Sequence, residues 1–183
     1  FKSNQVTNDG PNVKSLEKRL AQYLNVKNIV LVANGTLALQ LAYKALELDG
    51  QIITTPFSFN ATAGSILWSG LTPVFSDIDI HTFNISEELI EKKITKNTSA
   101  IVPVHAFGNS CNVEKIDKIA KNYNLKVVYD AAQAFGVNYK GGSILKYGDA
   151  SILSFHATKL FHTIEGGAIV TADSEVAKKI KSM

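Results

Sequence analysis

The chain has 183 residues, 45% of them hydrophobic, which is enough for one domain with a substantial core. The formal charge is +3, and the basic residues are spread along the chain, which argues against a nucleic-acid-binding face. The single cysteine, Cys111, excludes a disulfide framework and a cysteine-based metal site, and no apolar run approaches the length of a membrane span. With no signal-peptide composition at the N-terminus, a cytoplasmic location is expected.

Helical and extended patterns alternate along the chain. Apolar residues fall on one face of segment 12–24, which predicts a helix. The apolar run 28–33 predicts a buried strand, followed directly by a helix at 35–48. Further strands are expected at 51–55, 73–77, 99–105, 125–130, 149–155 and 166–171, and further helices at 61–70, 86–94, 112–123 and 174–183.

Strands that alternate with helices predict an α/β domain with a mostly parallel sheet. Helices cover both faces of such a sheet, which explains the continuous runs of valine and isoleucine. No repeat, low-complexity tract or interdomain linker is apparent. The last helix is uncapped at Met183, so the sequence predicts a fragment of a longer protein.

Two places in the sequence are candidates for binding a phosphate at the carboxyl ends of strands. Gly35 and Thr36 open a helix, and the free N–H groups of a helix N-terminus favour an anion. Ser154, near the end of the strand 149–155, adds a hydroxyl. A plain capped turn is the alternative for Gly35 and Thr36, and no G-x-G-x-x-G or Walker pattern indicates a nucleotide site.

An acid and an amide follow another predicted strand. Asp130 ends the run LKVVYD, where a carboxylate is costly to bury unless it is paired. It could pair with a cationic ligand group, or it could cap the next turn. Gln133 could hydrogen-bond a ligand oxygen, or it could be an ordinary amide on a helix face.

Lys159 follows the strand 149–155 and is the candidate nucleophile. A lysine desolvated in an apolar pocket becomes nucleophilic, whereas a solvated surface lysine does not. The neighbours expected to form such a pocket are Phe155, Leu160 and Phe161.

The aromatic segment 54–64 also follows a strand end. Phe59 is a candidate for stacking on a planar ring, and core packing is the preferred interpretation of Phe57. The chain has four histidines, but none has H-E-x-x-H spacing or an acid at ligand spacing, so no metal site is expected. The absence of G-x-S-x-G argues against a serine hydrolase.

Together these residues are more specific than any one of them alone. A phosphate-binding turn is followed by an aromatic residue, a strand-end acid, a serine and a lysine, which is the order needed to hold pyridoxal 5'-phosphate. That cofactor requires a lysine for covalent attachment and an acid at its pyridinium nitrogen.

Five segments covering nearly the whole chain resemble the DegT/DnrJ/EryC1/StrS family of sugar aminotransferases. They are NGTLALQLAYKAL, TTPFSFNATAGSILWSGLTPVFSDID, VPVHAFGNSCNVEKI, VVYDAAQAFG and SFHATKLFHTIEGGAIVT. The resemblance implies that residues 1–183 are the three-layer αβα large domain of a fold type I pyridoxal-phosphate enzyme. It also implies a homodimer with a shared active site, completed by a smaller C-terminal domain and by partner residues beyond Met183.

The resemblance assigns catalytic roles to Lys159 and Asp130, and it assigns Gln133 to binding the cofactor ring. Lys159 matches the lysine that attaches the cofactor and then moves a proton as general base and acid. Asp130 matches the acid at the pyridinium nitrogen, and Gln133 matches the amide beside the ring hydroxyl. The reaction implied is amino transfer from glutamate to a keto group on a nucleotide-linked sugar.

The same resemblance assigns cofactor-binding roles to five positions. Gly35, Thr36 and the backbone of Leu37 match the phosphate turn, although the family more often has alanine or serine at the position of Leu37. Ser154 matches the phosphate-binding serine, and Phe59 matches the aromatic that stacks on the ring.

Two blocks, TTPFSF and SFHATK, are most similar to enzymes that make amino-dideoxy sugars on dTDP for surface polysaccharides such as the lipopolysaccharide O-antigen. Relatives that act as dehydratases carry histidine in place of the lysine, so Lys159 argues against that activity. A non-catalytic regulatory domain that binds pyridoxal phosphate or another ligand remains the alternative.

Overall fold

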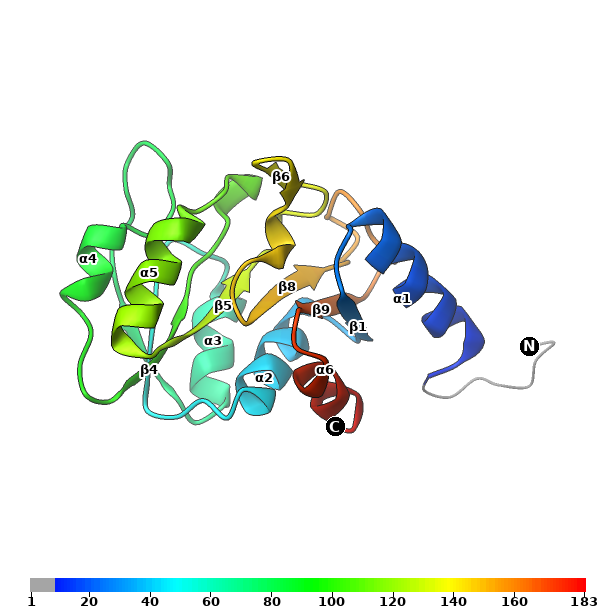
Figure 1. Cartoon of the computed structure of the whole chain (residues 1–183), viewed down its shortest axis with the longest axis horizontal. Coiled ribbons are helices and arrows are strands. Elements are labelled where there is room, and N and C mark those ends of the chain that lie inside the picture. Colours follow the sequence, from blue (N-terminus) through cyan, green and yellow to red (C-terminus); the bar gives the residue numbers. More distant parts are fainter. Residues whose placement is uncertain (1–8) are drawn as a thin grey trace.

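A seven-stranded sheet forms the centre of the molecule in a computed structural model that describes residues 9–183 (Figure 1). Its strands are β1 (Asn28–Val32), β2 (Gln51–Thr54), β3 (Thr72–Phe75), β4 (Thr98–Val102), β5 (Lys126–Asp130), β8 (Ala150–Ser154) and β9 (Gly167–Thr171). The strand order is β1-β9-β8-β5-β4-β2-β3. Strands β3, β2, β4, β5 and β8 pair in parallel, which confirms the predicted sheet.

Strand β9 departs from the parallel arrangement, since it pairs antiparallel with both β8 and β1. A parallel pair needs a crossover connection, usually a helix, between its strands. Residues 155–166 contain no helix, so the chain turns back and β9 runs beside β8 in the opposite direction.

Helices cover both faces of the sheet and form the predicted three layers (Figure 1). Residues of α1 (Pro11–Tyr23), α4 (Glu87–Glu91) and α5 (Val113–Tyr123) belong to one apolar cluster. Residues of α2 (Gly35–Ala45), α3 (Asn60–Trp68) and α6 (Ser174–Lys181) belong to the cluster on the other face. None of these helices has both the length and the apolar composition needed to cross a bilayer.

Helix α2 is shorter than predicted because it ends in a Schellman motif. Glu47 adopts a left-handed backbone with φ of 56°, and its N–H bonds the carbonyl of Lys44 at 3.1 Å. The N–H of Leu48 bonds the carbonyl of Tyr43 at 3.0 Å. These bonds satisfy carbonyls of the last turn and stop the helix.

Four short elements were not predicted. They are the 3₁₀ helices η1 (Ala106–Gly108) and η2 (Ile144–Lys146) and the hairpin strands β6 (Asn138–Tyr139) and β7 (Gly142–Ser143). Two-residue strands are too short to show alternation, but Lys140 and Gly141 both have positive φ, as a tight hairpin turn requires.

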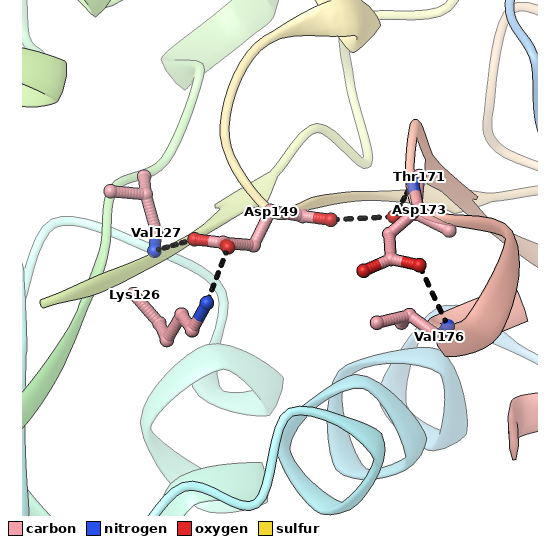
Figure 2. Close-up of polar contacts among 6 residues, drawn as sticks. All are labelled: Lys126, Val127, Asp149, Thr171, Asp173 and Val176. Carbon is pink, nitrogen blue, oxygen red and sulfur yellow. Dashed lines mark hydrogen bonds and ion pairs between the residues drawn. The ribbon is translucent and has the colours of Figure 1, made fainter.

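Asp149 ties three strands together at the amino ends of β5 and β8 (Figure 2). Its Oδ2 accepts from the N–H of Val127 at 2.8 Å, and its Oδ1 accepts from Lys126 Nζ at 3.0 Å. Its carbonyl accepts from the Thr171 hydroxyl at 2.7 Å, and that hydroxyl accepts from the N–H of Asp173 at 3.1 Å, just before α6. These bonds therefore hold β5, β8 and β9 next to one another at the edge of the sheet opposite to the carboxyl ends of the parallel strands.

Replacing Asp149 with alanine is expected to lower the free energy of unfolding by about 1–3 kcal/mol, because the partly buried N–H of Val127 loses its partner. Urea denaturation measures this. The control is Asp117→Ala, which breaks an exposed ion pair with Lys121 and should change stability by less than about 1 kcal/mol. Equal effects of the two substitutions would contradict the interpretation.

Candidate active site

A cavity of about 830 Å³ opens where the parallel strands β5 and β8 end and helix α2 begins. The structure brings to it all of the predicted site residues except Leu37. Those that line it are Gly35, Thr36, Phe59, Asp130, Gln133, Ser154 and Lys159.

Leu37 lies outside the cavity wall, and its backbone amide already has a partner. The amide donates to Asn34 Oδ1 at 2.8 Å, which caps helix α2. The first amides of a helix have no partner within it, so Gly35 and Thr36 keep their N–H groups available for an anion. A phosphate contact at the amide of Leu37, predicted from the family resemblance, would need Asn34 to release it.

The turn at Gly35 lies against two strands with no room for a side chain. A Cβ atom on Gly35 would lie 3.1 Å from Ser154 Cβ. A Cβ atom on Gly167, in β9, would lie 2.5 Å from the carbonyl carbon of Asn34 and 2.7 Å from the nitrogen of Gly35. Both glycines therefore allow the start of α2 and the Ser154 hydroxyl to share one wall of the cavity.

Replacing Gly167 with alanine is expected to push the turn off the sheet and to lower the free energy of unfolding by about 1–3 kcal/mol. Cofactor affinity should fall as well, because the amides of Gly35 and Thr36 move with the turn. The matched control is Gly64→Ala in α3, where a Cβ atom meets nothing within 4 Å. The Gly64→Ala substitution should stabilise the helix by about 1 kcal/mol. Chemical denaturation measures the free energy of unfolding of both variants. A Gly167→Ala protein as stable as the parent would refute the packing argument.

Asp130 is a buried carboxyl with two donors and a cationic neighbour. Its side chain is held by the Thr62 hydroxyl, which donates to Oδ2 at 2.6 Å, and by the N–H of Ala132, which donates to Oδ1 at 3.1 Å. Burial raises the pKa of Asp130, while Thr62, Ala132 and the charge of Lys159 act in the opposite direction. The structure thus shows the predicted turn contact and also places the carboxyl at the cavity.

Gln133 is oriented by the backbone of η1. Its Oε1 accepts from the N–H of Phe107 at 2.7 Å, so its NH₂ group remains a donor for a ligand oxygen. Phe107 has a left-handed backbone with φ of 56°, which aims its N–H at Gln133. The sequence did not indicate this contact, although Gly108 in HAFGN was a signal of a tight turn.

Lys159 lies on the segment between β8 and β9 and lines the cavity with its side chain partly buried. Within residues 9–183 no ion pair or hydrogen bond engages its amine. Phe155 and Phe161 anchor the segment, because their rings pack edge to face at 5.0 Å. The expected apolar pocket around Lys159 is not found, because Phe155, Leu160 and Phe161 do not line the cavity. Leu160 is 90% exposed, and the rings of Phe155 and Phe161 pack against Phe135 instead.

Of the two aromatic residues after β2, Phe57 differs from its predicted position and Phe59 does not. Phe59 is 78% exposed at the cavity, where it is accessible to a planar ring. Phe57 was expected in the core but is 39% exposed, and its ring packs against Phe83 at 5.7 Å and Phe107 at 6.0 Å. Phe57 therefore belongs to the wall of the cavity.

Several polar residues at or near the cavity were not predicted as site residues, among them Thr62, His156 and Glu165. Thr62 contacts Asp130, as described above, and His156 and Glu165 line the cavity 3.6 Å apart. No three His, Cys, Asp or Glu side chains within residues 9–183 gather closely enough to hold a metal ion.

The fold and the solved structures similar to it define a class of enzyme. The solved structures that superpose on this chain are aminotransferases of fold type I, with the same α/β architecture. Within that class, the chain belongs to the DegT/DnrJ/EryC1/StrS aminotransferase family, whose model matches residues 1–183. Aminotransferases of this family use pyridoxal phosphate.

Three relatives illustrate the similarity. The dTDP-4-amino-4,6-dideoxy-D-glucose transaminase of Shigella dysenteriae is 53% identical over 98% of this chain and 49% of its own length. DesI, solved in the presence of its TDP-sugar product, superposes with a TM-score of 0.96 at 39% identity, over 99% of this chain and 46% of DesI. NtdA of Bacillus subtilis, with bound cofactor PMP, has a TM-score of 0.89 at 37% identity, over 94% of this chain and 39% of NtdA. The chain thus spans about half the length of the curated relative.

The cavity fits pyridoxal phosphate on its own geometry. The glycine turn against Ser154 leaves a backbone cradle for a phosphate at a helix N-terminus. The buried Asp130 suits a cationic ring nitrogen, because a paired charge offsets the loss of hydration. Lys159 lines the same cavity.

Proposed function

We propose that this chain is the cofactor-binding large domain of a pyridoxal-phosphate-dependent aminotransferase that acts on nucleotide-linked keto-sugars. One observation carries the proposal: Lys159 and the buried carboxyl of Asp130 line the same cavity. A lysine that forms a covalent bond and an acid at the ring nitrogen are the two groups that this cofactor requires of a protein.

The remaining cavity residues bind and orient the cofactor. The amides of Gly35 and Thr36 and the hydroxyl of Ser154 hold the phosphate, because the start of a helix favours an anion. Phe59 covers one face of the ring. The NH₂ group of Gln133 donates to the ring oxygen, since its Oε1 is engaged by the backbone.

Lys159 and Asp130 carry the proton transfers. When bound, pyridoxal phosphate supplies a carbonyl that condenses with amines and a ring that withdraws electrons from the adjacent carbon. The amine of Lys159 would attach the cofactor and, once displaced by the amino donor, would serve as the general base and acid that moves a proton from the donor Cα. Asp130 would hold a proton at the ring nitrogen throughout. The donor would leave as its oxo-acid, and the same two residues would then serve the transfer of the amino group to the keto-sugar, whose carbonyl oxygen leaves as water.

The proposed substrates are glutamate as donor and a dTDP-linked keto-deoxy-sugar as acceptor, for surface-polysaccharide synthesis such as that of the lipopolysaccharide O-antigen. The similarity to a transaminase of a dTDP-dideoxy-sugar and to DesI, which has a TDP-sugar product, supports the acceptor. The donor and the biosynthetic role rest on the family resemblance of the sequence.

We also propose a homodimer with a shared active site. On the segment that carries Lys159, the apolar side chains of Leu160 and Ile164 are 90% and 72% exposed, and a second copy would cover them. Light scattering of the full-length protein tests this, and a monomer at micromolar concentration would contradict it.

The direct test of the proposed function is to incubate the full-length protein with pyridoxal phosphate, glutamate and dTDP-4-keto-6-deoxyglucose. Formation of 2-oxoglutarate together with an aminated nucleotide sugar, seen by mass spectrometry, is the expected result. Cofactor binding without 2-oxoglutarate formation would favour a non-catalytic binding domain instead.

A further inference from the structure

Two hydroxyl groups form a chain that ends on Asp130. Ser58 Oγ lies 2.6 Å from Thr62 Oγ1, and Thr62 Oγ1 lies 2.6 Å from Asp130 Oδ2. An ionised carboxylate only accepts hydrogen bonds, so the Thr62 hydrogen points to Asp130 and the Ser58 hydroxyl donates to Thr62. Ser58 lines the cavity, whereas Thr62 is fully buried.

Contacts with Ser65, and through it with Tyr43, hold the backbone of Thr62 in place. Thr62 lies in the first turn of α3, and its carbonyl accepts from Ser65 Oγ at 2.9 Å. The hydroxyl of Tyr43 in α2 lies 3.4 Å from Ser65 Oγ. Because threonine is β-branched, few side-chain conformers are open to it, and the helix determines where its hydroxyl points.

Among the groups around Asp130, Thr62 is the side chain that donates a hydrogen bond to the carboxyl. Oδ1 is held by a backbone N–H, that of Ala132, so Thr62 is the side-chain donor to this carboxyl within residues 9–183. Burial raises the pKa of Asp130, and the titratable group that opposes this rise is Lys159, through its charge. Burial also raises the pKa of the nearby Tyr43, with a smaller contribution from the Asp130 carboxylate. Burial opposes ionisation, and the Thr62 hydroxyl counters it. His156 and Glu165 line the same cavity.

We propose that Thr62 is a positioning residue for Asp130: its hydroxyl, itself held by Ser58, fixes the orientation of the carboxylate and keeps it ionised within the cavity. The inference rests on the proposed function, in which Asp130 faces the ring nitrogen of the cofactor. A carboxyl that became protonated, or that rotated, would no longer hold a proton at that nitrogen.

The test uses the full-length protein with Thr62→Val, which keeps the shape of the side chain and removes the donor, and with Thr62→Ser, which keeps the donor. In the cofactor-free protein, the titration of Asp130 is followed by carbon-13 NMR of its carboxyl. The valine variant should titrate at higher pH than the parent, and serine should restore the parent behaviour. With cofactor, the valine variant should bind pyridoxal phosphate about tenfold more weakly.

The matched control is Thr54→Val. Thr54 is also fully buried and donates from Oγ1 to the carbonyl of Val102 at 2.8 Å, so it loses a comparable hydrogen bond away from Asp130. In the Thr54→Val variant, Asp130 should titrate as it does in the parent. Ser58→Ala gives a second variant that leaves the core intact, and a smaller rise in the same direction is expected.

An unchanged Asp130 titration in Thr62→Val, or in Ser58→Ala if the valine variant does not fold, would overturn the inference. The NMR readout needs no cofactor, so it separates this inference from the proposed function. If Thr62→Val shifts the Asp130 titration but the parent protein never binds pyridoxal phosphate, the role of Thr62 is supported and the proposed function is refuted.

Discussion

Lys159→Ala in the full-length protein is expected to abolish the visible absorbance that pyridoxal phosphate acquires on covalent attachment. Amino transfer should fall by at least about 10²–10⁴-fold, because the same amine is the general base and acid of the proton transfer. Titrating cofactor into parent and variant, and then adding glutamate, measures both effects. In the parent the absorbance should appear with cofactor and bleach with glutamate.

The control for this substitution is Lys146→Ala. Lys146 is exposed, lies in η2 and does not line the cavity, so its removal changes the net charge equally without touching the site. The parent absorbance should survive it. If Lys159→Ala retained the absorbance, Lys159 would not be the residue that attaches the cofactor. If none of the three proteins showed the absorbance, the alternative of a domain that binds a different ligand would be favoured.

Asp130→Asn is expected to separate activity from stability. The loss of the charge opposite the ring nitrogen should lower the rate of amino transfer by about 10²–10³-fold. The cofactor-free variant should nevertheless be more stable than the parent at pH 8, because the parent must keep a buried carboxyl ionised there. Steady-state rates and urea denaturation measure the two effects.

The pH dependence of this stability difference follows from the pKa. Burial raises the pKa of Asp130 in the folded state above its ordinary value of 3.8. The carboxyl therefore favours folding fully below the unfolded pKa, and this contribution is lost as the pH rises through the folded pKa. The gain from Asp130→Asn should be present at pH 8 and should disappear as the pH falls towards 4.

The control for the stability measurement is Asp49→Asn, at an exposed carboxyl outside the cavity. It should change the free energy of unfolding little at either pH. If Asp130→Asn were less stable than the parent at pH 8, the hydrogen bonds from Thr62 and Ala132 would outweigh the cost of burying the charge. The expectation that the ionised carboxyl destabilises the folded protein would then be wrong.

Local pattern was enough to predict the strands of the seven-stranded sheet and the α-helices, but not their lengths. The seven sheet strands and six helices lie where apolar periodicity placed them, because burial of one helix face or of a strand leaves a repeat in the sequence. Helix α4 was predicted over 86–94 but spans only Glu87–Glu91, and α2 stops at its Schellman motif. The ends of a helix depend on a few backbone hydrogen bonds, which the apolar periodicity of the sequence does not indicate.

The sequence by itself determined the α/β class, the family and the positions of Lys159, Asp130 and the glycine turn. These follow from motifs in which neighbouring residues act together, such as DAAQA, and motifs of this kind are read directly along the chain. The membership of the family then carried the expected roles of Gln133, Ser154 and Phe59.

Only the tertiary structure decided which side chains surround those residues. Thr62 reaches Asp130 across 68 positions, and Phe57 lies in the cavity wall rather than in the core. The antiparallel course of β9 likewise depends on the helix-free connection after β8. Each of these contacts joins elements that are brought together by sheet order and helix packing, and neither leaves a local repeat in the sequence.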